Sequence, residues 1–283
     1  MAERLSMDYN ESLTRASFSA LLELAVTLKS YRDSIVLVGG WVPYLLIDEF
    51  GRGDFKHVGS IDIDLAIDPK EIDVNVYNTI VELIEDRGYK NRLDKKGDPI
   101  IFSFSKSISS PLDGKEHMIG VDFLTYGTDE STGHRHRTVQ TDLPARIAGG
   151  CELAFEHNLN KRLNGVLPGN GETVEDIKML DIAGCVGMKG IVLGDRYKEK
   201  DAYDIYSVVR YCLDDPKAVA EEIKPYLEDD LMREGIRSIT QKFRDIRAEG
   251  PSWVANFTSL DPEEKEREQA ASYITIKEFL DKL

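Results

Sequence analysis

Two aspartates, Asp62 and Asp64, lie two positions apart in the segment 59–68 (GSIDIDLAID). Apolar side chains alternate with acidic or small ones there, which is the period of a β-strand, and side chains two positions apart share one face of a strand. Two neighbouring carboxylates repel each other, so the pair costs stability unless a cation lies between them. The pattern therefore favours Mg²⁺, which proteins bind through a few carboxylates and through the phosphates of a substrate.

A third acid, Asp122, interrupts the segment 117–126 (HMIGVDFLTY), which is otherwise apolar, β-branched or aromatic. Aspartate is disfavoured in a strand and is rarely buried without a partner. Three carboxylates can hold two metal ions, and such a pair of ions can clamp the attacking and leaving oxygens of a phosphoryl or nucleotidyl transfer. The alternative is that Asp62 and Asp64 form the solvated face of an edge strand while Asp122 caps a turn.

A glycine pair, Gly39 and Gly40, follows the segment 32–38 (RDSIVLV), which reads as a short buried strand. Glycine allows the backbone to approach a phosphate closely, and a helix from about Trp41 presents free N–H groups at its start. The pair is therefore a candidate phosphate-binding turn upstream of the acids.

This combination resembles the DNA polymerase β-type nucleotidyltransferase superfamily, in which a Gly-Gly or Gly-Ser turn opens a helix, a strand carries paired acids, and a neighbouring strand carries a third. The gap from Gly40 to Asp62 is longer than is usual in that superfamily, and the segment 51–57 (GRGDFKH) fills it. The resemblance implies transfer of a nucleoside monophosphate from an NTP to an acceptor. Asp62, Asp64 and Asp122 would hold Mg²⁺ or Mn²⁺, and Asp122 would alternatively act as the base toward the acceptor hydroxyl.

A second block narrows the resemblance to one subfamily. It consists of 179–192 (MLDIAGCVGMKGIV) and 195–206 (DRYKEKDAYDIY). A lysine on one helix, then Lys-Asp-x-x-Asp opening the next, is similar to the AbiEii-type toxin nucleotidyltransferases. This likeness implies that Lys189 contacts the triphosphate, that Asp201 lies beside the active site, and that Ser60 is a phosphate ligand. From the residues alone, the alternatives are that Lys189 is an ordinary solvated lysine and that Asp201 caps a helix. For Asp204 the residues favour a structural role as the ion-pair partner of a nearby Arg or Lys.

Composition limits the class of protein. The chain has 283 residues, 41% hydrophobic and 31% charged, which is an ordinary globular mixture with room for two domains. The net charge of −15 argues against broad nonspecific nucleic-acid binding. Three widely spaced cysteines fit buried thiols better than disulfides or a zinc site. We expect no membrane span and a cytoplasmic location.

The coarse pattern predicts a helix over 11–30, a strand at 34–38, a helix at 41–49 and the acidic strand at 60–67. A helix over 71–87 and strands at 98–104 and 117–126 follow, then a basic spot at 134–137 (HRHR) and short strands at 151–155 and 162–167. From about 175 the pattern is helical, with segments 176–192, 200–213, 216–227, 229–248 and 262–282.

The predicted fold class is therefore α/β (α+β): an N-terminal catalytic domain, residues 1–174, with a mixed β-sheet flanked by helices, and a C-terminal helical domain, residues 175–283. We expect Lys189 and Asp201 to face the carboxylates from the helical domain. The leading interpretation is a toxin-like enzyme acting on RNA or protein and held in check by an antitoxin. The alternatives are transfer to a small hydroxylated molecule such as an aminoglycoside, and a nucleotide-binding protein without catalysis.

Overall fold

The computed structural model describes residues 5–72, 79–127 and 135–283. The chain divides into two compact units. The sheet unit comprises Asn10–Trp41 and Ser60–Leu180. The helical unit comprises Val42–Gly59 and Asp181–Leu283, together with the N-terminal residues up to Tyr9. The segment Val42–Gly59 thus groups with the C-terminal residues, and the predicted division between residues 174 and 175 stays a prediction.

One sheet contains the nine strands of the described residues, and the path along it is β3-β4-β5-β2-β1-β9-β8, with β7 beside β5 and β6 beside β7. The pairs β1–β9, β2–β5 and β5–β7 are parallel and the others antiparallel, so the predicted mixed sheet is confirmed. The strands are β1 (Ile35–Val38), β2 (Ile63–Ile67), β3 (Lys90–Leu93), β4 (Pro99–Ser109), β5 (Glu116–Thr125), β6 (His136–Gln140), β7 (Leu143–Ile147), β8 (Asn158–Val166) and β9 (Glu172–Leu180).

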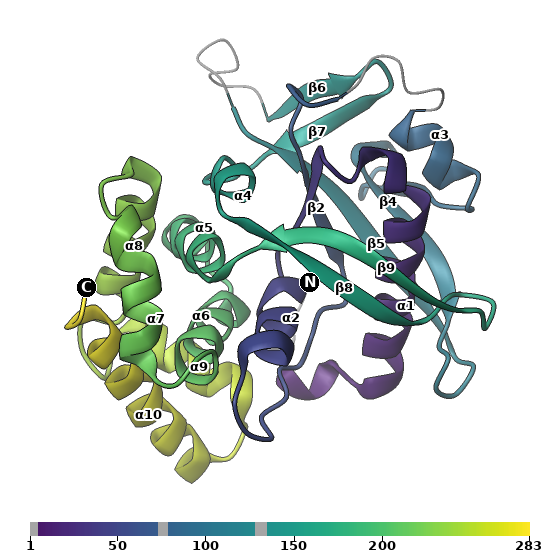
Figure 1. Ribbon diagram of the computed structural model, residues 1–283. Coiled ribbons are helices and arrows are strands. Elements are labelled where there is room, and N and C mark those ends of the chain that lie inside the picture. The colour runs from purple at the N-terminus through teal and green to yellow at the C-terminus, as the bar shows by residue number, and fades with distance from the viewer. Residues whose placement is uncertain (1–4, 73–78, 128–134) are drawn as a thin grey trace. The chain divides into compact units, whose positions relative to one another are not determined.

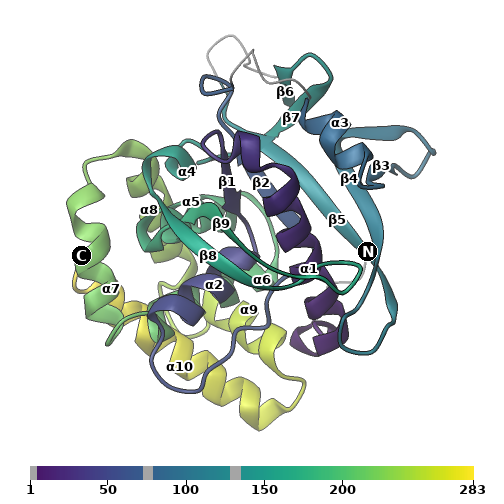
Figure 2. The ribbon, with the colours of Figure 1, turned by 45° about the vertical axis from the view of Figure 1, so that its right-hand side comes forward.

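The apolar face of this sheet packs against helix α1 (Glu11–Thr27), which crosses the strands in Figure 2. Alternate residues of β2 and β5 on this face, such as Ile63 and Val121, are fully buried. Lys106 of β4 shares the face and donates to Glu23 of α1 at 2.8 Å. Because side chains alternate along a strand, the residues in between lie on the opposite face, and these include the acids.

Three predicted elements of the sheet unit differ from the structure. Of the helix predicted at 71–87, residues 73–78 lie outside the described residues, and the described helix is α3 (Ile80–Glu85). The predicted strand at 151–155 is replaced by a single helical turn, α4 (Leu153–Glu156), whose Leu153 and Ala154 are buried. The helix predicted from residue 176 begins later, because residues up to Leu180 belong to β9, which pairs over its whole length with β8. The pairing of β8 with β9 in a hairpin thus outweighs the helical pattern predicted for residues 176–180. Asp181 caps the helix that follows by accepting a hydrogen bond from Gly184 N–H.

The helical unit contains most of the helices, and α5 and α8 lie side by side (Figure 1). Glycines explain their close approach: a Cβ at Gly190 would lie 2.4 Å from the Gly235 carbonyl oxygen. Beyond α1 and α4, the helices of the two units are α2 (Trp41–Phe50), α3 (Ile80–Glu85), α5 (Ile182–Asp195), α6 (Glu199–Tyr211), α7 (Pro216–Ile223), α8 (Asp230–Lys242), α9 (Glu249–Thr258) and α10 (Pro262–Leu280).

Helix α9 is absent from the sequence prediction, which ran one helix over 229–248 and treated Gly250-Pro251 as a break. The structure instead ends α8 at Lys242 and places Pro251 in the first turn of α9. Proline is tolerated there because the first-turn N–H groups have no partner within the helix. None of the helices in the described ranges has both the length and the apolar character needed to cross a membrane.

Candidate functional site

The three predicted carboxylates come together on the face of the sheet opposite α1. Asp64 of β2 is the direct partner of Asp122 on the parallel strand β5, and paired residues of neighbouring strands point to the same face. Asp62 lies two positions before Asp64, just ahead of β2. Two of the acids thus come from neighbouring strands, whereas Asp62 lies in a bend, because the strand predicted at 60–67 begins only at Ile63.

Gly39 leaves the space that the carboxylate of Asp64 occupies. It follows β1, where Val38 is paired with Asp64, and its φ of 73° lies in the left-handed region that favours glycine. A Cβ at Gly39 would lie 2.1 Å from Asp64 Oδ2, so no other residue fits without moving the acid. Gly40 comes next and leads into α2. Whether Gly39 and Gly40 bind a nucleotide stays a prediction.

A buried serine connects the glycine turn to the acidic strand. Ser17 of α1 donates its hydroxyl to the Ile61 carbonyl at 2.9 Å and accepts a hydrogen bond from Trp41 Nε1 at 3.1 Å. Ser60, predicted to bind phosphate, donates its hydroxyl to the Asp62 carbonyl at 2.8 Å. The two bonds to carbonyl groups fix the backbone at Ile61 and Asp62, directly before β2. The phosphate role of Ser60 stays a prediction.

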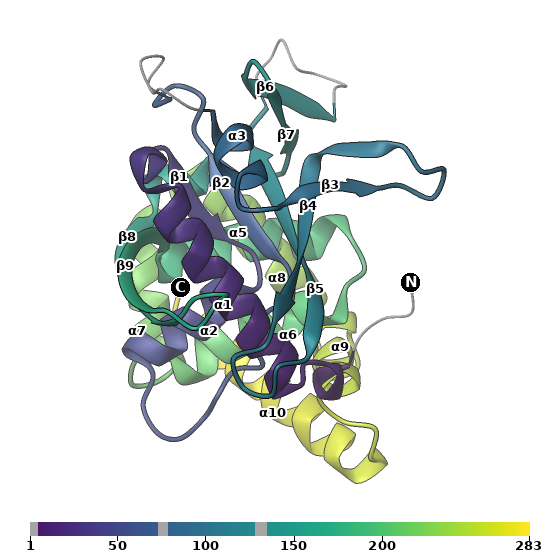
Figure 3. The ribbon, with the colours of Figure 1, turned by 90° about the vertical axis from the view of Figure 1, so that its right-hand side faces the viewer.

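Arg92 is a residue of this surface that the sequence did not indicate. It lies on β3, in the hairpin with β4 that projects from the edge of the sheet (Figure 3). Its Nη1 atom is 3.9 Å from Asp62 Oδ1 and 3.9 Å from Asp122 Oδ1. Gly120 makes room for this contact, because a Cβ there would lie 2.5 Å from Asp62 Oδ1 and 2.9 Å from Arg92 Nη1.

Ser103 is the second residue that the sequence did not indicate. It faces Asp122 across the β4–β5 pair and donates its hydroxyl to Asp122 Oδ1. The alternation of 119–122 (IGVD) carried a signal for Gly120, since residues two positions apart share a face. No comparable signal existed for Arg92 or Ser103, whose positions depend on the strand order of the sheet.

The donor chemistry of this surface suits a hard divalent cation, since carboxylate oxygens are the ligands that Mg²⁺ and Mn²⁺ prefer. Asp62 and Asp122 share one guanidinium, that of Arg92, at 3.9 Å, which leaves negative charge that such an ion can offset. Within the part of the chain that the structure describes, however, no three His, Cys, Asp or Glu side chains converge in a metal-holding group. Metal binding therefore stays a prediction.

The second predicted group, around Lys189 and Asp201, is a buried network within the helical unit. Lys189 Nζ donates to Asp201 Oδ1 at 3.1 Å and to Asp204 Oδ2 at 2.5 Å. Lys200 Nζ donates to Asp204 Oδ1 at 2.7 Å, and Arg196 Nε donates to Asp201 Oδ2 at 3.0 Å. The alternative of a solvated Lys189 is therefore wrong, while the predicted ion-pair role of Asp204 is confirmed.

The protonation states in this network follow from burial and from charge. Burial opposes the charged form of Lys189, but Asp204 and Asp201 outweigh it and raise the pKa of that lysine above its usual value. Burial likewise acts to raise the pKa of Asp204, but Lys189 and Lys200 lower it well below the usual value. Both groups are thus held in their charged forms at neutral pH.

His57 closes the network in its neutral form. Its Nδ1 atom accepts from Gly59 N–H at 3.1 Å, so its Nε2–H points to Asp204 Oδ1, also at 3.1 Å. Burial lowers the pKa of His57 from 6.5 to about 4, and the bond to Asp204 only partly opposes this. Sequence analysis does not indicate this role, because His57 lies in the segment 51–57, which is interpreted as a loop.

The basic spot at 134–137 is only partly described. His134 lies outside the described residues, whereas Arg135 and His136 are exposed. The guanidinium carbon of Arg137 lies 5.3 Å from the ring centroid of Tyr126, a cation–π contact.

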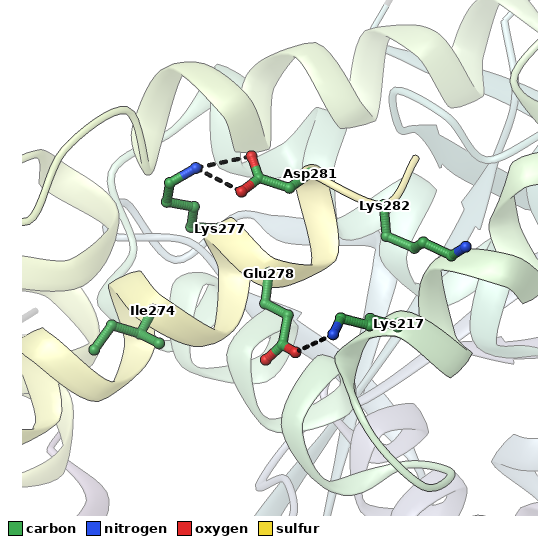
Figure 4. Close-up of a pocket in the computed structure, with 6 residues that line it drawn as sticks. All are labelled: Lys217, Ile274, Lys277, Glu278, Asp281 and Lys282. Carbon is green, nitrogen blue, oxygen red and sulfur yellow. Dashed lines mark hydrogen bonds and ion pairs between the residues drawn. The ribbon is translucent and has the colours of Figure 1, made fainter.

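A pocket of about 450 Å³ lies between α7 and the end of α10 in the helical unit (Figure 4). Its charged side chains are neutralised by one another or by a neighbour: Lys217 pairs with Glu278, Lys277 with Asp281, and Lys282 with Glu221. Such mutually compensated surface charges offer little to a ligand. We assign this pocket no function.

No protein-family model matches the sequence, and no curated protein matches it either. Solved structures similar to the chain include an antigenic nucleotidyltransferase-like protein from Paracoccidioides brasiliensis, with 16% identity, a TM-score of 0.45, and coverage of 91% of this chain and 97% of that one. Another is JHP933 from Helicobacter pylori, with 13% identity, a TM-score of 0.39, and coverage of 96% and 95%. Similarities this low say nothing about activity, so the functional argument rests on the side chains.

Proposed function

We propose that the chain is a metal-dependent nucleotidyltransferase that moves a nucleoside monophosphate from an NTP to an acceptor. One observation carries the proposal: Asp64 and Asp122 are direct cross-strand partners, and Asp62 shares their face of the sheet. Like charges placed directly opposite each other destabilise a sheet, so such an arrangement is retained most readily where a ligand offsets the charge.

We assign each residue of the site a role in the proposed transfer. Asp62, Asp64 and Asp122 would hold Mg²⁺ or Mn²⁺, and such an ion, when bound, neutralises charge on the phosphates of the NTP. The hydroxyl of Ser103 orients Asp122 through Oδ1, so this carboxylate is positioned either as a ligand or as a base toward the acceptor hydroxyl. Gly39 and Gly40 would let the backbone approach the triphosphate.

The resemblance to AbiEii-type proteins supplies further roles that we retain as part of the proposal. Ser60 would contact a phosphate, Lys189 would neutralise charge on the departing pyrophosphate, and Asp201 would lie beside the site. Lys189 already donates to two carboxylates, so contact with pyrophosphate requires that it exchange at least one of them.

For the acceptor we propose RNA or a protein, with an antitoxin as the partner that restrains the enzyme in the cytoplasm. This choice rests on the spacing of Ser60, Lys189 and Asp201 in the sequence. A small cationic acceptor such as an aminoglycoside is the second candidate, and the net charge of −15 favours it.

The test is calorimetric titration of the four NTPs with and without Mg²⁺, followed by a pyrophosphate-release assay. The variants are Asp64→Asn and Asp122→Asn, with Asp98→Asn as the control because Asp98 is an exposed acid of the same unit. We expect Mg²⁺-dependent binding in the wild type and the control, and loss of binding and transfer in the two variants. Full activity of both variants would refute the proposal, and binding without pyrophosphate release would favour a non-catalytic nucleotide-binding protein.

A further inference from the structure

The position of Arg92 between two proposed metal ligands has a consequence for how a cation enters. Its Nη1 atom is equidistant from Asp62 Oδ1 and Asp122 Oδ1, at 3.9 Å from each. Nη1 also lies next to Gly120, where a Cβ would come within 2.9 Å of it. The missing side chain at Gly120 thus provides the space in which the guanidinium and the Asp62 carboxylate meet.

We propose that Arg92 is a positioning residue that bridges Asp62 and Asp122 until a divalent cation displaces it. The inference rests on the proposed function, because it takes these two aspartates as metal ligands. Arg92 would then tune the affinity of the site for the cation, and it would keep the carboxylates from repelling each other before the cation binds.

Charge repulsion makes the two occupants compete. Bonds from Mg²⁺ to oxygen are about 2 Å long, so an ion held by both Oδ1 atoms draws them to within about 4 Å of each other. A guanidinium nitrogen that stayed 3.9 Å from both oxygens would then lie less than about 4 Å from the ion. Two cations this close repel each other, and the divalent ion has the stronger attraction to the carboxylates, so the cation displaces the guanidinium.

The bridge is also weak enough to be displaced. Both contacts are longer than the roughly 2.7 to 3.2 Å of an N–H···O hydrogen bond, so they are ion pairs without a direct bond. The side chain of Arg92 is 36% exposed and that of Asp62 is 50% exposed, and exposed ion pairs contribute little to stability. Among the described strands, β3 is an edge strand that pairs with β4 alone, so the partly exposed side chain of Arg92 has room to turn toward solvent.

The test measures binding of Mn²⁺ without nucleotide, by calorimetry at low ionic strength, so it does not depend on activity. Removing a positive charge about 4 Å from the carboxylates should tighten binding of a divalent ion roughly tenfold in Arg92→Gln. Arg92→Met should behave in the same way, and Arg92→Lys should stay close to the wild type because it retains the charge.

Arg87→Gln is the control, because it removes the same charge from an exposed arginine outside the strand. Thermal unfolding in EDTA verifies that each variant folds. Unchanged or weaker Mn²⁺ binding in both Arg92→Gln and Arg92→Met, with normal binding by the wild type, would overturn this inference and leave the proposed function standing. An equal gain in Arg87→Gln would overturn it too, since net charge would then explain the effect. Absence of Mn²⁺ binding by the wild type would overturn both.

Discussion

The buried His57 predicts an acid sensitivity of the helical unit that a single substitution should remove. The side chain of His57 is 0% exposed, its Nδ1 accepts from Gly59 N–H, and its Nε2 lies 3.1 Å from Asp204 Oδ1. Burial lowers the pKa of His57 from 6.5 to about 4 in the folded chain. The perturbation is His57→Gln, which keeps an N–H donor for Asp204 but cannot titrate in this range.

The sign and size follow from linkage. Below pH 6.5 the unfolded chain binds a proton at this histidine that the folded chain does not, so the free energy of unfolding falls as the pH falls toward 4. Each pH unit within this window is worth about 1.4 kcal/mol. Between pH 7 and pH 4.5, therefore, the wild type should lose about 2 to 3 kcal/mol more than His57→Gln loses.

The assay is urea unfolding at pH 7, 6, 5 and 4.5, followed by tryptophan fluorescence. The chain has two tryptophans, and Trp41→Phe leaves Trp253 of the helical unit as the reporter in both backgrounds. Subtracting the two pH profiles cancels the other titrating groups. Profiles that stay parallel within about 0.5 kcal/mol would refute the assignment of a neutral buried histidine.

Two further substitutions test the carboxylate site of the sheet unit and the lysine network of the helical unit separately. Gly39→Ala should abolish Mn²⁺ binding, because its Cβ would lie 2.1 Å from Asp64 Oδ2. The positive φ of this residue adds about 1 to 2 kcal/mol of backbone strain. Calorimetry measures the Mn²⁺ affinity, and an unchanged affinity would contradict the prediction. Lys189→Met should destabilise the helical unit by about 3 to 5 kcal/mol at pH 7, because it breaks a buried ion network. Urea unfolding without nucleotide checks this, and unaltered stability with lost nucleotide binding would instead favour the triphosphate role.

The sequence was sufficient for the part of the site that depends on strand period alone. The spacing of Asp62 and Asp64 predicts one shared face, and Asp64 does lie in a strand, whereas Asp62 lies in the bend directly before it. The conformational demand on Gly39 was also readable, because a glycine at the end of a buried strand is typical of a turn. These inferences need only local geometry.

The rest of the site depends on pairing between strands, which sequence periodicity does not specify. Arg92 reaches Asp122 only because β3 pairs with β4 and β4 with β5, and the β3–β4 register contains an irregularity between Asn91 and Leu93. The error at 176–180 has the same origin: these residues adjoin a helical segment in the sequence, but the pairing of Ile177 and Met179 with β8 makes them part of a strand. Tertiary pairing decided both cases.

The two charged groups differ in how completely their charges are compensated. In the helical unit, Asp201 and Asp204 accept bonds from three cationic side chains, and both acids are at most 2% exposed in their side chains. In the sheet unit, two carboxylates share one guanidinium at 3.9 Å and remain 50% and 23% exposed.

The degree to which the charges are paired and buried determines how much free energy a ligand must spend to bind at each group. Under the proposal, a cation that approaches the sheet carboxylates displaces one weakly held arginine. An anion that approaches Lys189 must instead break two buried contacts and leave a buried carboxylate with fewer partners, which costs several kcal/mol. We therefore assign ligand binding to the carboxylates, whereas the lysine network joins α5 and α6. A triphosphate contact by Lys189 would require that network to rearrange on binding.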